Sequence, residues 1–267
     1  AAGDRLALAR RVPQPEACLD WSDEEIILLG HLVGDGSYLV HQLLRYTTAS
    51  EENSQAVANA ARALGSTVNR HEGRGAWHQL VISGNGNRWH AEGVGKWLKG
   101  LGIFGQRSHE KHLPADVFRF SDRKIGLLIR HLWATDGSIT VRKAGTRGSS
   151  RIHFATCSER LARDVMALLL RLGIVARLRT VHQKHYRPMY SVDVTGSDNQ
   201  RAFLDRVGAF GPRVAQADEL AARLDGVEGN TNVDTVPIEV FAEVRAAMAA
   251  NGVTQRAMAR LRGTSYG

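Results

Sequence analysis

Hydrophobic residues recur at helical spacing in two stretches of the chain, and each stretch ends in the same tripeptide, Asp-Gly-Ser. The first stretch occupies residues 22–37 and the second residues 121–138. A serine begins each stretch, and Glu25 completes a capping box with Ser22, which predicts a helix start. The glycine of each tripeptide predicts the helix end. The two aspartates are 101 residues apart (136 − 35), so the chain repeats a unit that places one carboxylate at the end of an apolar helix.

The segments after each apolar helix predict the same order of elements twice. In the first copy we predict two strands within residues 38–48, a helix at 51–64, a hairpin of strands 67–71 and 77–83, and a helix at 88–102. In the second copy we predict strands at 138–143 and 151–156, a helix at 159–172, strands at 175–182 and 189–195, and a helix at 197–207. Each copy has the order αββαββα. This order predicts an α+β fold of two pseudo-symmetric halves, each an antiparallel sheet with helices on one face and the other face open.

The pattern divides the chain into five segments. They are a lead-in segment (1–20), half one (21–120), half two (121–212), a polar linker (213–235) and a helical extension (236–267). The extension predicts a helix, a short turn at Gly252 and a second helix capped by Thr254, which is typical of a helix-turn-helix. Arg256 and Arg260 share a face of that second helix and are candidate DNA contacts. A plain helical hairpin packed on the core explains the same pattern equally well.

The open sheet faces are predicted to be polar and rich in arginine. In the strand 151–156, Ile152 and Phe154 point to one side while Arg151 and His153 point to the other. Arginine can contact guanine and glutamine can contact adenine in the DNA major groove, so base recognition is favoured over an ordinary solvated face. The candidate DNA-binding residues are Arg45, Thr47, Arg70, Trp77, Gln79, Thr140, Arg142, Arg147, Arg151, His153, Arg177, Arg179 and Lys184, together with Arg256 and Arg260.

Composition supports an acidic partner. Lys and Arg number 35 against 27 for Asp and Glu, which gives a net charge of +8, and arginine predominates. An arginine-rich surface that reflects a high-GC coding bias is the alternative. No apolar run approaches the ~18–20 residues of a membrane span, and no secretory signal is evident. Cys18 and Cys157 lack metal or redox spacing, so we expect a reducing, cytoplasmic location.

The two repeated stretches resemble the nine-residue signature of the LAGLIDADG homing endonucleases, at 28–36 and again at 129–137. Departures from the signature are His31 and Val33 in the first copy, and Arg130, His131 and Ala134 in the second. The resemblance covers roughly residues 22–210 and implies a monomer in which the two motif helices pack side by side. The chain opens without Met, Cys or Ser and does not close in His-Asn. The resemblance implies the endonuclease domain of a bacterial intein, and these ends lead us to expect that domain without its splicing domain.

The resemblance also implies the site. Asp35 and Asp136 would bind Mg²⁺ or Mn²⁺, with Gly34 and Thr135 beside them in the metal site, whereas Ca²⁺ would bind without supporting cleavage. Lys111, in a Lys-His-Leu-Pro block, matches the active-site lysine of intein endonucleases. The second-half counterpart is Arg213 or Lys184. The alternative is that each aspartate merely ends a helix, which the helix dipole disfavours.

The expected function is site-specific cleavage of both strands of a long, pseudo-palindromic DNA target. Two alternatives stay open: a non-cutting regulator that combines a LAGLIDADG core with a helix-turn-helix, and an RNA-splicing maturase. Retention of both aspartates argues against the regulator, because a protein that only binds DNA needs no pair of carboxylates facing phosphates.

Overall fold

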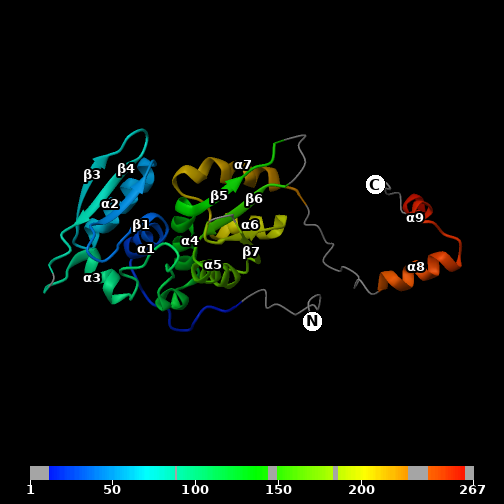
Figure 1. Cartoon of the computed structure of the whole chain (residues 1–267), viewed down its shortest axis with the longest axis horizontal. Coiled ribbons are helices and arrows are strands. Elements are labelled where there is room, and N and C mark those ends of the chain that lie inside the picture. Colours follow the sequence, from blue (N-terminus) through cyan, green and yellow to red (C-terminus); the bar gives the residue numbers. More distant parts are fainter. Residues whose placement is uncertain (1–11, 88, 144–148, 183–185, 228–239, 262–267) are drawn as a thin grey trace. The chain divides into compact units, whose positions relative to one another are not determined.

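The computed structural model describes residues 12–87, 89–143, 149–182, 186–227 and 240–261. The chain forms two compact units, residues 1–228 and 229–267. The first unit contains both sheets, and the second contains two short helices (Figure 1). Residues 1–11 of the lead-in segment, and the candidates Arg147 and Lys184, lie outside the described residues.

Half one follows the predicted order of elements. Its elements are α1 (Asp23–Asp35), β1 (Gly36–Ser37), β2 (Leu44–Thr48), α2 (Glu51–Ala63), β3 (Thr67–Glu72), β4 (His78–Ser83) and α3 (Gly93–Gly100). The Ser22–Glu25 capping box is present, as the sequence predicted. The helix predicted at 88–102 is shorter, because the Asn87 side chain accepts hydrogen bonds from the backbone amides of Trp89 and His90 and holds a turn there.

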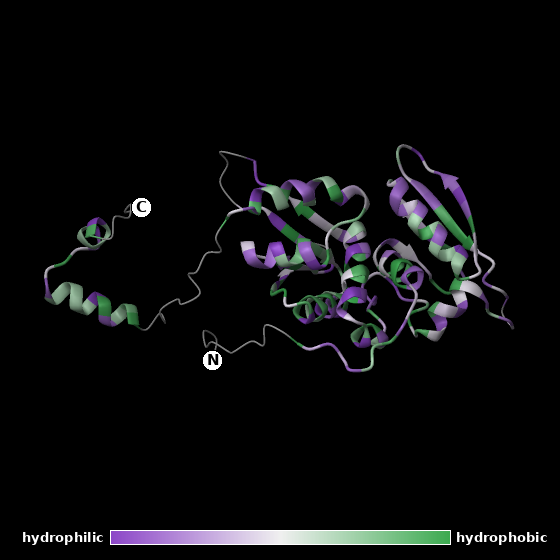
Figure 2. Ribbon diagram, turned by 180° about the vertical axis from the view of Figure 1, so that it is seen from behind, coloured by the Kyte–Doolittle hydropathy of each residue, from purple (hydrophilic) through white to green (hydrophobic). Residues whose placement is uncertain are grey.

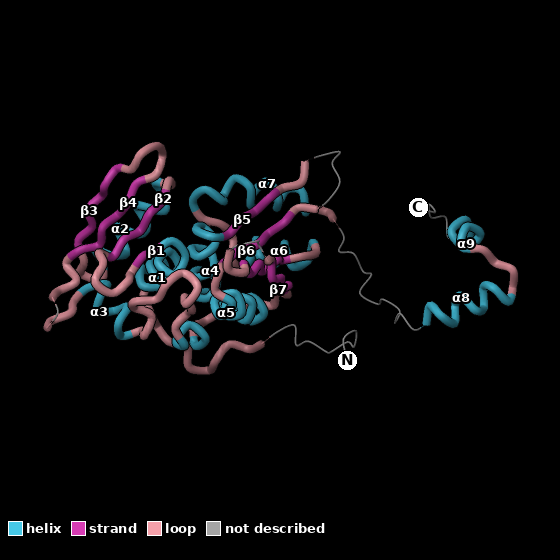
Figure 3. The backbone as a smooth tube through the Cα atoms, viewed as in Figure 1, coloured by secondary structure: helices cyan, strands magenta, loops and turns pink. Residues whose placement is uncertain are grey.

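Half two repeats this arrangement after a short 3₁₀ segment, η1 (Ala115–Arg119). Its elements are α4 (Asp122–Asp136), β5 (Gly137–Thr140), β6 (Arg151–Thr156), α5 (Glu159–Arg171), β7 (Ala176–Val181), β8 (Met189–Val194) and α6 (Ser197–Arg206). The sheets have the equivalent antiparallel orders β1-β2-β4-β3 and β5-β6-β8-β7. Figure 3 shows helices lying between the two sets of strands. The predicted α+β class with two four-stranded halves is confirmed.

The two halves meet along α1 and α4, which lie side by side. A Cβ atom on Gly30 would lie 3.0 Å from the Cβ of His131, and one on Gly34 would lie 2.0 Å from the Thr135 hydroxyl oxygen. Each glycine of α1 therefore faces a larger residue of α4. The close crossing arises from complementary side chains rather than from small residues on both helices.

Two histidines are buried in this contact. His31 Nε2 lies 3.0 Å from His131 Nδ1, and His31 Nδ1 lies 3.0 Å from the Tyr46 hydroxyl. Burial lowers the pKa of His31 to about 3 and that of His131 to about 4. Both rings are therefore neutral at pH 7, and the hydrogen bonds satisfy polar atoms that burial would otherwise penalise.

Residues 213–235, predicted to be a linker, include a helix instead, α7 (Val214–Leu224). Ala217, Leu220 and Leu224 recur at helical spacing and are buried in the same hydrophobic core as both halves. Each buried leucine contributes about 1.5–3 kcal/mol, so this helix belongs to the first unit. Charged residues between the apolar positions concealed the pattern. In Figure 2 the helices likewise carry both hydrophobic residues (green) and hydrophilic residues (purple).

The second unit contains α8 (Val240–Ala250) and α9 (Gln255–Leu261), neither of which has a buried residue. The Thr254 hydroxyl accepts a hydrogen bond from the Ala257 amide and caps α9. The helix-turn-helix therefore stays a prediction. Over the described part of the chain, no helix is long and apolar enough to cross a membrane.

Candidate functional site

The paired aspartates are the last residues of the two packed helices, Asp35 of α1 and Asp136 of α4. The glycine after each is sterically required. A Cβ atom on Gly36 would lie 2.4 Å from the Leu32 carbonyl oxygen, and one on Gly137 would lie 2.3 Å from the Trp133 ring. Both glycines have extended φ values, −74° and −85°, so close approach explains them, not a left-handed turn.

Both carboxylates line one hollow of about 580 Å³. Although solvent reaches them, the surrounding protein raises the pKa of Asp35 to about 6, and the nearby charge of Asp136 adds to this rise. Burial also raises the pKa of Asp136. The lysine and arginine beside the pair, Lys111 and Arg213, oppose the rise at Asp35. Both carboxyl groups thus ionise less readily than usual. A bound cation would stabilise their ionised forms.

Lys111 lines the same hollow and is only 6% exposed. Its ammonium donates hydrogen bonds to the carbonyl oxygens of Gly34 (2.6 Å), Gly36 (2.9 Å) and Leu32 (3.3 Å). Burial lowers the pKa of Lys111 to about 8, against the effect of the two aspartates. This lysine therefore caps the end of α1 and adds a charged donor to the carbonyls there.

The end of α4 is held differently. The Thr135 hydroxyl donates to the Leu132 carbonyl oxygen (2.6 Å), and Asn53 donates to the Ala134 carbonyl oxygen (3.1 Å). None of the lysines among the described residues caps α4 as Lys111 caps α1. The Thr135 side chain faces Gly34 between the helices, and Gly34 also lines the hollow, so the placing of both residues at a metal site stays a prediction.

Arg213 ends a short 3₁₀ turn, η2 (Gly211–Arg213). Its charge lowers the pKa of Asp35, which places it near the acidic pair. Its Nε atom is buried without a hydrogen-bond partner among the described residues. The structure therefore brings Asp35, Asp136 and Lys111 together as the resemblance implied, with Arg213 nearby.

The oxygen donors fit a hard cation. Carboxylates suit Mg²⁺ or Mn²⁺, whereas softer metals favour histidine and cysteine. No group of three or more His, Cys, Asp or Glu side chains is arranged to hold a metal ion within the described ranges. Asp35 and Asp136 would supply the charge at such a site, with water or a substrate oxygen completing the coordination.

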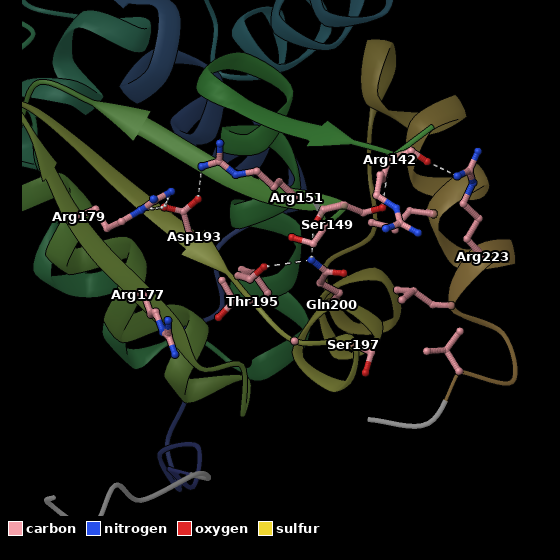
Figure 4. A pocket seen from close by; sticks show the side chains of 16 residues that line it. Arg142, Ser149, Arg151, Arg177, Arg179, Asp193, Thr195, Ser197, Gln200 and Arg223 are labelled. Atoms are coloured by element: carbon pink, nitrogen blue, oxygen red, sulfur yellow. Dashed lines mark hydrogen bonds and ion pairs between the residues drawn. The ribbon is translucent and has the colours of Figure 1, made fainter. Parts of the chain in front are cut away.

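The open face of the second sheet carries three of the predicted arginines, Arg151, Arg177 and Arg179. Cross-strand register places Arg151 opposite Thr140, and Asp193 opposite both His153 and Arg177. Arg179 and Arg151 both bind Asp193 (Figure 4). Arg142 follows β5 and lines the hollow of about 710 Å³ around this group. Sequence reasoning missed Asp193, although its alternation with Val192 and Val194 places it on this face.

The open face of the first sheet is less charged. Arg45 and Thr47 of β2 lie opposite Val81 and Gln79 of β4. Gln79 donates to the Thr47 hydroxyl (3.1 Å). Arg45 Nε and His153 Nδ1, at equivalent places in the two sheets, are buried polar atoms with no hydrogen-bond partner among the described residues. Buried polar atoms of this kind usually bind an ordered water or a ligand.

One DNA-binding prediction is corrected. Arg70 lies opposite the buried Leu80, so it points to the helix-covered side, where Glu51 and Glu72 bind its guanidinium. The open-face residues of β3 are instead Asn69 and His71, which lie opposite Val81 and Gln79. The choice of Arg70 followed its charge rather than the strand alternation.

The remaining predicted contacts are on loops or in the second unit. Trp77 precedes β4, is 44% exposed and covers Gly73 of the same hairpin. Arg256 and Arg260 are both on α9.

Comparison with known proteins finds one family model and several partial relatives. Residues 124–208, within half two, match the family model of the LAGLIDADG-like domain. The replicative DNA helicase DnaB of Rhodothermus marinus is 40% identical over 278 residues, which cover 99% of this chain but only 29% of that protein. Protein RecA of Mycobacterium tuberculosis is 26% identical over 80% of this chain and 28% of its own length. The chain thus spans less than a third of these relatives.

Solved structures with a similar fold include the homing endonuclease I-DmoI in complex with DNA and Mn. It has a TM-score of 0.49 at 15% identity and covers 70% of this chain and 96% of that chain. Full-length DUF199/WhiA from Thermatoga maritima has the same TM-score and identity and covers 91% of this chain and 71% of that chain. Neither likeness identifies an activity for this chain.

Proposed function

We propose that the chain is a metal-dependent, site-specific endonuclease that cuts both strands of double-stranded DNA. The pair of aspartates at the ends of α1 and α4 carries this proposal. Burial raises the pKa of both carboxyl groups, and the charge of Asp136 raises that of Asp35 further, so the pair suits a divalent cation that also holds a phosphate oxygen. One chain supplies both halves, so we propose that it acts as a monomer.

The bound metal would activate water and stabilise the negative charge that develops on the leaving oxygen. The chain's own residues position that chemistry. Lys111 fixes the backbone around Asp35 through three carbonyls, and its ammonium offsets the negative charge of both aspartates. Arg213, beside Asp35, would contact the phosphate of the second half. Magnesium or manganese is expected to support cleavage, and calcium is expected to support binding alone.

The two open faces would grip one duplex. Arginines supply contacts to phosphates and guanines, and the net charge of +8 favours a salt-sensitive association with DNA. The second unit would add contacts through Arg256 and Arg260 of α9. Deletion of residues 229–267 is expected to weaken binding without abolishing cleavage, which gel-shift titration of the shortened chain would measure.

The partial matches support an intein origin. Proteins with different names, DnaB and RecA, each match this chain over less than a third of their own length. A segment shared by otherwise different proteins behaves as an insert that moves between genes, and a DNA-cutting activity is what such movement needs. We therefore propose the endonuclease part of an intein, and we do not assign helicase or recombinase activity to it.

The test is cleavage of a randomised double-stranded DNA library in Mg²⁺. The parent chain is expected to enrich one cut site, and Asp35→Asn and Asp136→Asn are each expected to reduce cleavage about 10³-fold, equivalent to about 4 kcal/mol. The matched control is Asp218→Asn, an exposed aspartate of α7 outside the hollow. Unchanged cleavage by both site variants would reject the carboxylate assignment.

A non-cutting DNA-binding regulator is the second candidate. The observation that favours it is the Lys111 ammonium, which is already engaged with three carbonyls and has no lysine counterpart among the described residues at α4. Sequence-specific binding in the library, with no cut product in Mg²⁺ or Mn²⁺ and unchanged affinity in the two aspartate variants, would support the regulator.

A further inference from the structure

A buried carboxylate holds two arginines at the centre of the open face of the second sheet. Asp193 of β8 is only 3% exposed. One of its oxygens accepts a hydrogen bond from Arg151 Nη2 at 2.6 Å. The other accepts from Arg179 Nε at 2.9 Å and from the Ser191 hydroxyl at 2.9 Å, with Arg179 Nη2 2.8 Å away. Both oxygens therefore bind side chains of the protein itself.

The arginines themselves remain at the surface. The side chain of Arg151 is 47% exposed and that of Arg179 is 57% exposed, whereas the Asp193 side chain is 5% exposed. A surface ion pair usually contributes little, because both partners are solvated and mobile. Here the Asp193 carboxylate is buried and fixed in position. The ion pairs therefore restrict the orientations of the two guanidinium groups.

The geometry at Arg179 leaves a particular edge available. Its Nε and Nη2 atoms both approach one oxygen of Asp193, so the side edge of the guanidinium faces the carboxylate. The end edge, with Nη1 and the second hydrogen of Nη2, has no further partner among the described residues. Two parallel N–H groups on one edge match the O6 and N7 acceptors of guanine in the major groove.

The surroundings favour a base contact from a cationic surface. Five arginines line the hollow, with Asp193 as the one carboxylate among its lining residues (Figure 4). They are Arg142, Arg151, Arg177, Arg179 and Arg223. Phosphate attraction alone would be served best by arginines without a carboxylate between them, since Asp193 cancels one positive charge. The buried Asp193 lowers the positive charge of this surface but fixes the orientation of the arginines. Base recognition requires such a fixed orientation.

We propose that Asp193 is a specificity-determining positioning residue that orients Arg151 and Arg179 to read guanines in the half of the DNA site that contacts the second sheet. This inference rests on the proposed function as a DNA-binding protein. Asp193 does not touch DNA; it acts by holding the guanidinium groups in the rotamers that present their free edges to the major groove. The two arginines come from β6 and β7, on either side of β8, so the guanines are close together in one half-site.

The test begins with selection of DNA by the full chain from a randomised duplex library in EDTA, which prevents cutting. Each guanine of the selected site is then replaced singly by 7-deazaguanine, which lacks the N7 acceptor but keeps the base pair. The parent chain is expected to lose affinity about tenfold at one or two guanines of one half-site. In Asp193→Asn and Asp193→Val, that loss is expected to fall to less than about twofold at the same guanines. Valine is the residue at the matching place of the first sheet, Val81.

The control is Asp198→Asn, an exposed aspartate paired with Arg201 at the start of α6, which is expected to keep the parent pattern. If the parent chain selects no sequence, the proposed function and this inference both fail. If the parent selects a site and the Asp193 variants keep its 7-deazaguanine sensitivity, DNA binding stands and the positioning role is rejected. Tighter binding of the variants to all DNA with an unchanged guanine pattern also rejects it, because Asp193 would then only mask charge.

Discussion

The two halves have the same strand order, but the centre of the open face is apolar in half one and acidic in half two. In half one, Val81 of β4 lies opposite Arg45 and Asn69. In half two, the equivalent residue of β8 is Asp193, opposite His153 and Arg177. Register and the buried alternate residues are common to both sheets because they form the core. The open faces carry no such packing constraint, so each half can suit a different half of an asymmetric DNA target.

The helices that join the halves differ in the same way. Helix α1 has glycines where α4 has His131 and Thr135, and α1 alone is capped by a lysine among the described residues. A symmetric repeat would place like residues against each other on the axis. Close packing favours the opposite solution, in which a gap on one helix receives a side chain from the other.

Substitution of Lys111 is expected to have the largest effect, because this residue caps α1 and has no lysine counterpart at α4 among the described residues. Lys111→Met removes the ammonium that donates to the carbonyls of Leu32, Gly34 and Gly36, so the free energy of unfolding should fall by about 1–3 kcal/mol. Because α4 has no equivalent lysine in the described chain, cleavage of one strand should slow about 10–100-fold more than the other. Accumulation of nicked plasmid during a time course would measure this. Lys96→Met, at an exposed lysine of α3, is the control; equal slowing of both strands would contradict the asymmetry.

Exchanging the small and large residues of the helix contact tests its complementarity. In Gly34→Ala the new Cβ would lie 2.0 Å from the Thr135 hydroxyl and 2.6 Å from its Cβ, so overpacking should cost about 1–3 kcal/mol. Adding Thr135→Gly should recover at least about 1 kcal/mol through coupling, and Thr135→Ala should recover less. Urea unfolding measures both. Gly100→Ala, where a Cβ meets no atom within 4 Å, should leave stability nearly unchanged. Simple additivity of the two substitutions would exclude direct packing between them.

The histidine pair should make stability depend on pH. The folded-state pKa values of about 3 and about 4 lie below the unfolded value of 6.5. The unfolded chain therefore binds protons first, and each histidine costs about 1 kcal/mol of stability as the pH falls from 7.5 to 5.5. Asp35, whose pKa is raised to about 6, gains a proton in the folded state over part of this range and opposes the loss.

Comparison with His131→Leu isolates the histidine effect, because the Asp35 contribution is present in both proteins. The stability difference between parent and variant should shrink by about 1 kcal/mol between pH 7.5 and 5.5, measured by urea unfolding at each pH. Parallel pH curves for the two proteins would show that His131 takes up its proton in the folded state as readily as in the unfolded chain.

The smallest effect is expected from the aspartates in the absence of metal. At pH 7.5 ionisation of either carboxyl group works against its raised pKa, so Asp35→Asn or Asp136→Asn should increase stability by no more than about 1 kcal/mol, or roughly 2–4 °C in Tm. Added Mg²⁺ should raise the Tm of the parent chain more than that of either variant. A lower Tm for both variants would mean that the carboxylates support the helix ends rather than a metal.

Much of the fold could be predicted because it follows from local signals. The capping box at Ser22, the alternation of Ile152 and Phe154 with polar neighbours, and the repeated Asp-Gly-Ser all act within a few residues of the chain. Helix α7 was not predicted, because its three buried apolar residues lie among charged residues. Arg70 was predicted to contact DNA, but its place opposite the buried Leu80 puts it on the helix-covered face.

The sequence by itself determined the two-fold repeat, the α+β class and the delivery of one carboxylate by each motif helix, since periodicity and capping are encoded between neighbours in the chain. Only the tertiary structure decided which groups meet across the repeat: Gly34 against Thr135, His31 against His131, Lys111 on the carbonyls of α1, and Asp193 between two arginines. These contacts join residues from different strands and helices. Their geometry depends on how the whole core packs, which no local pattern specifies.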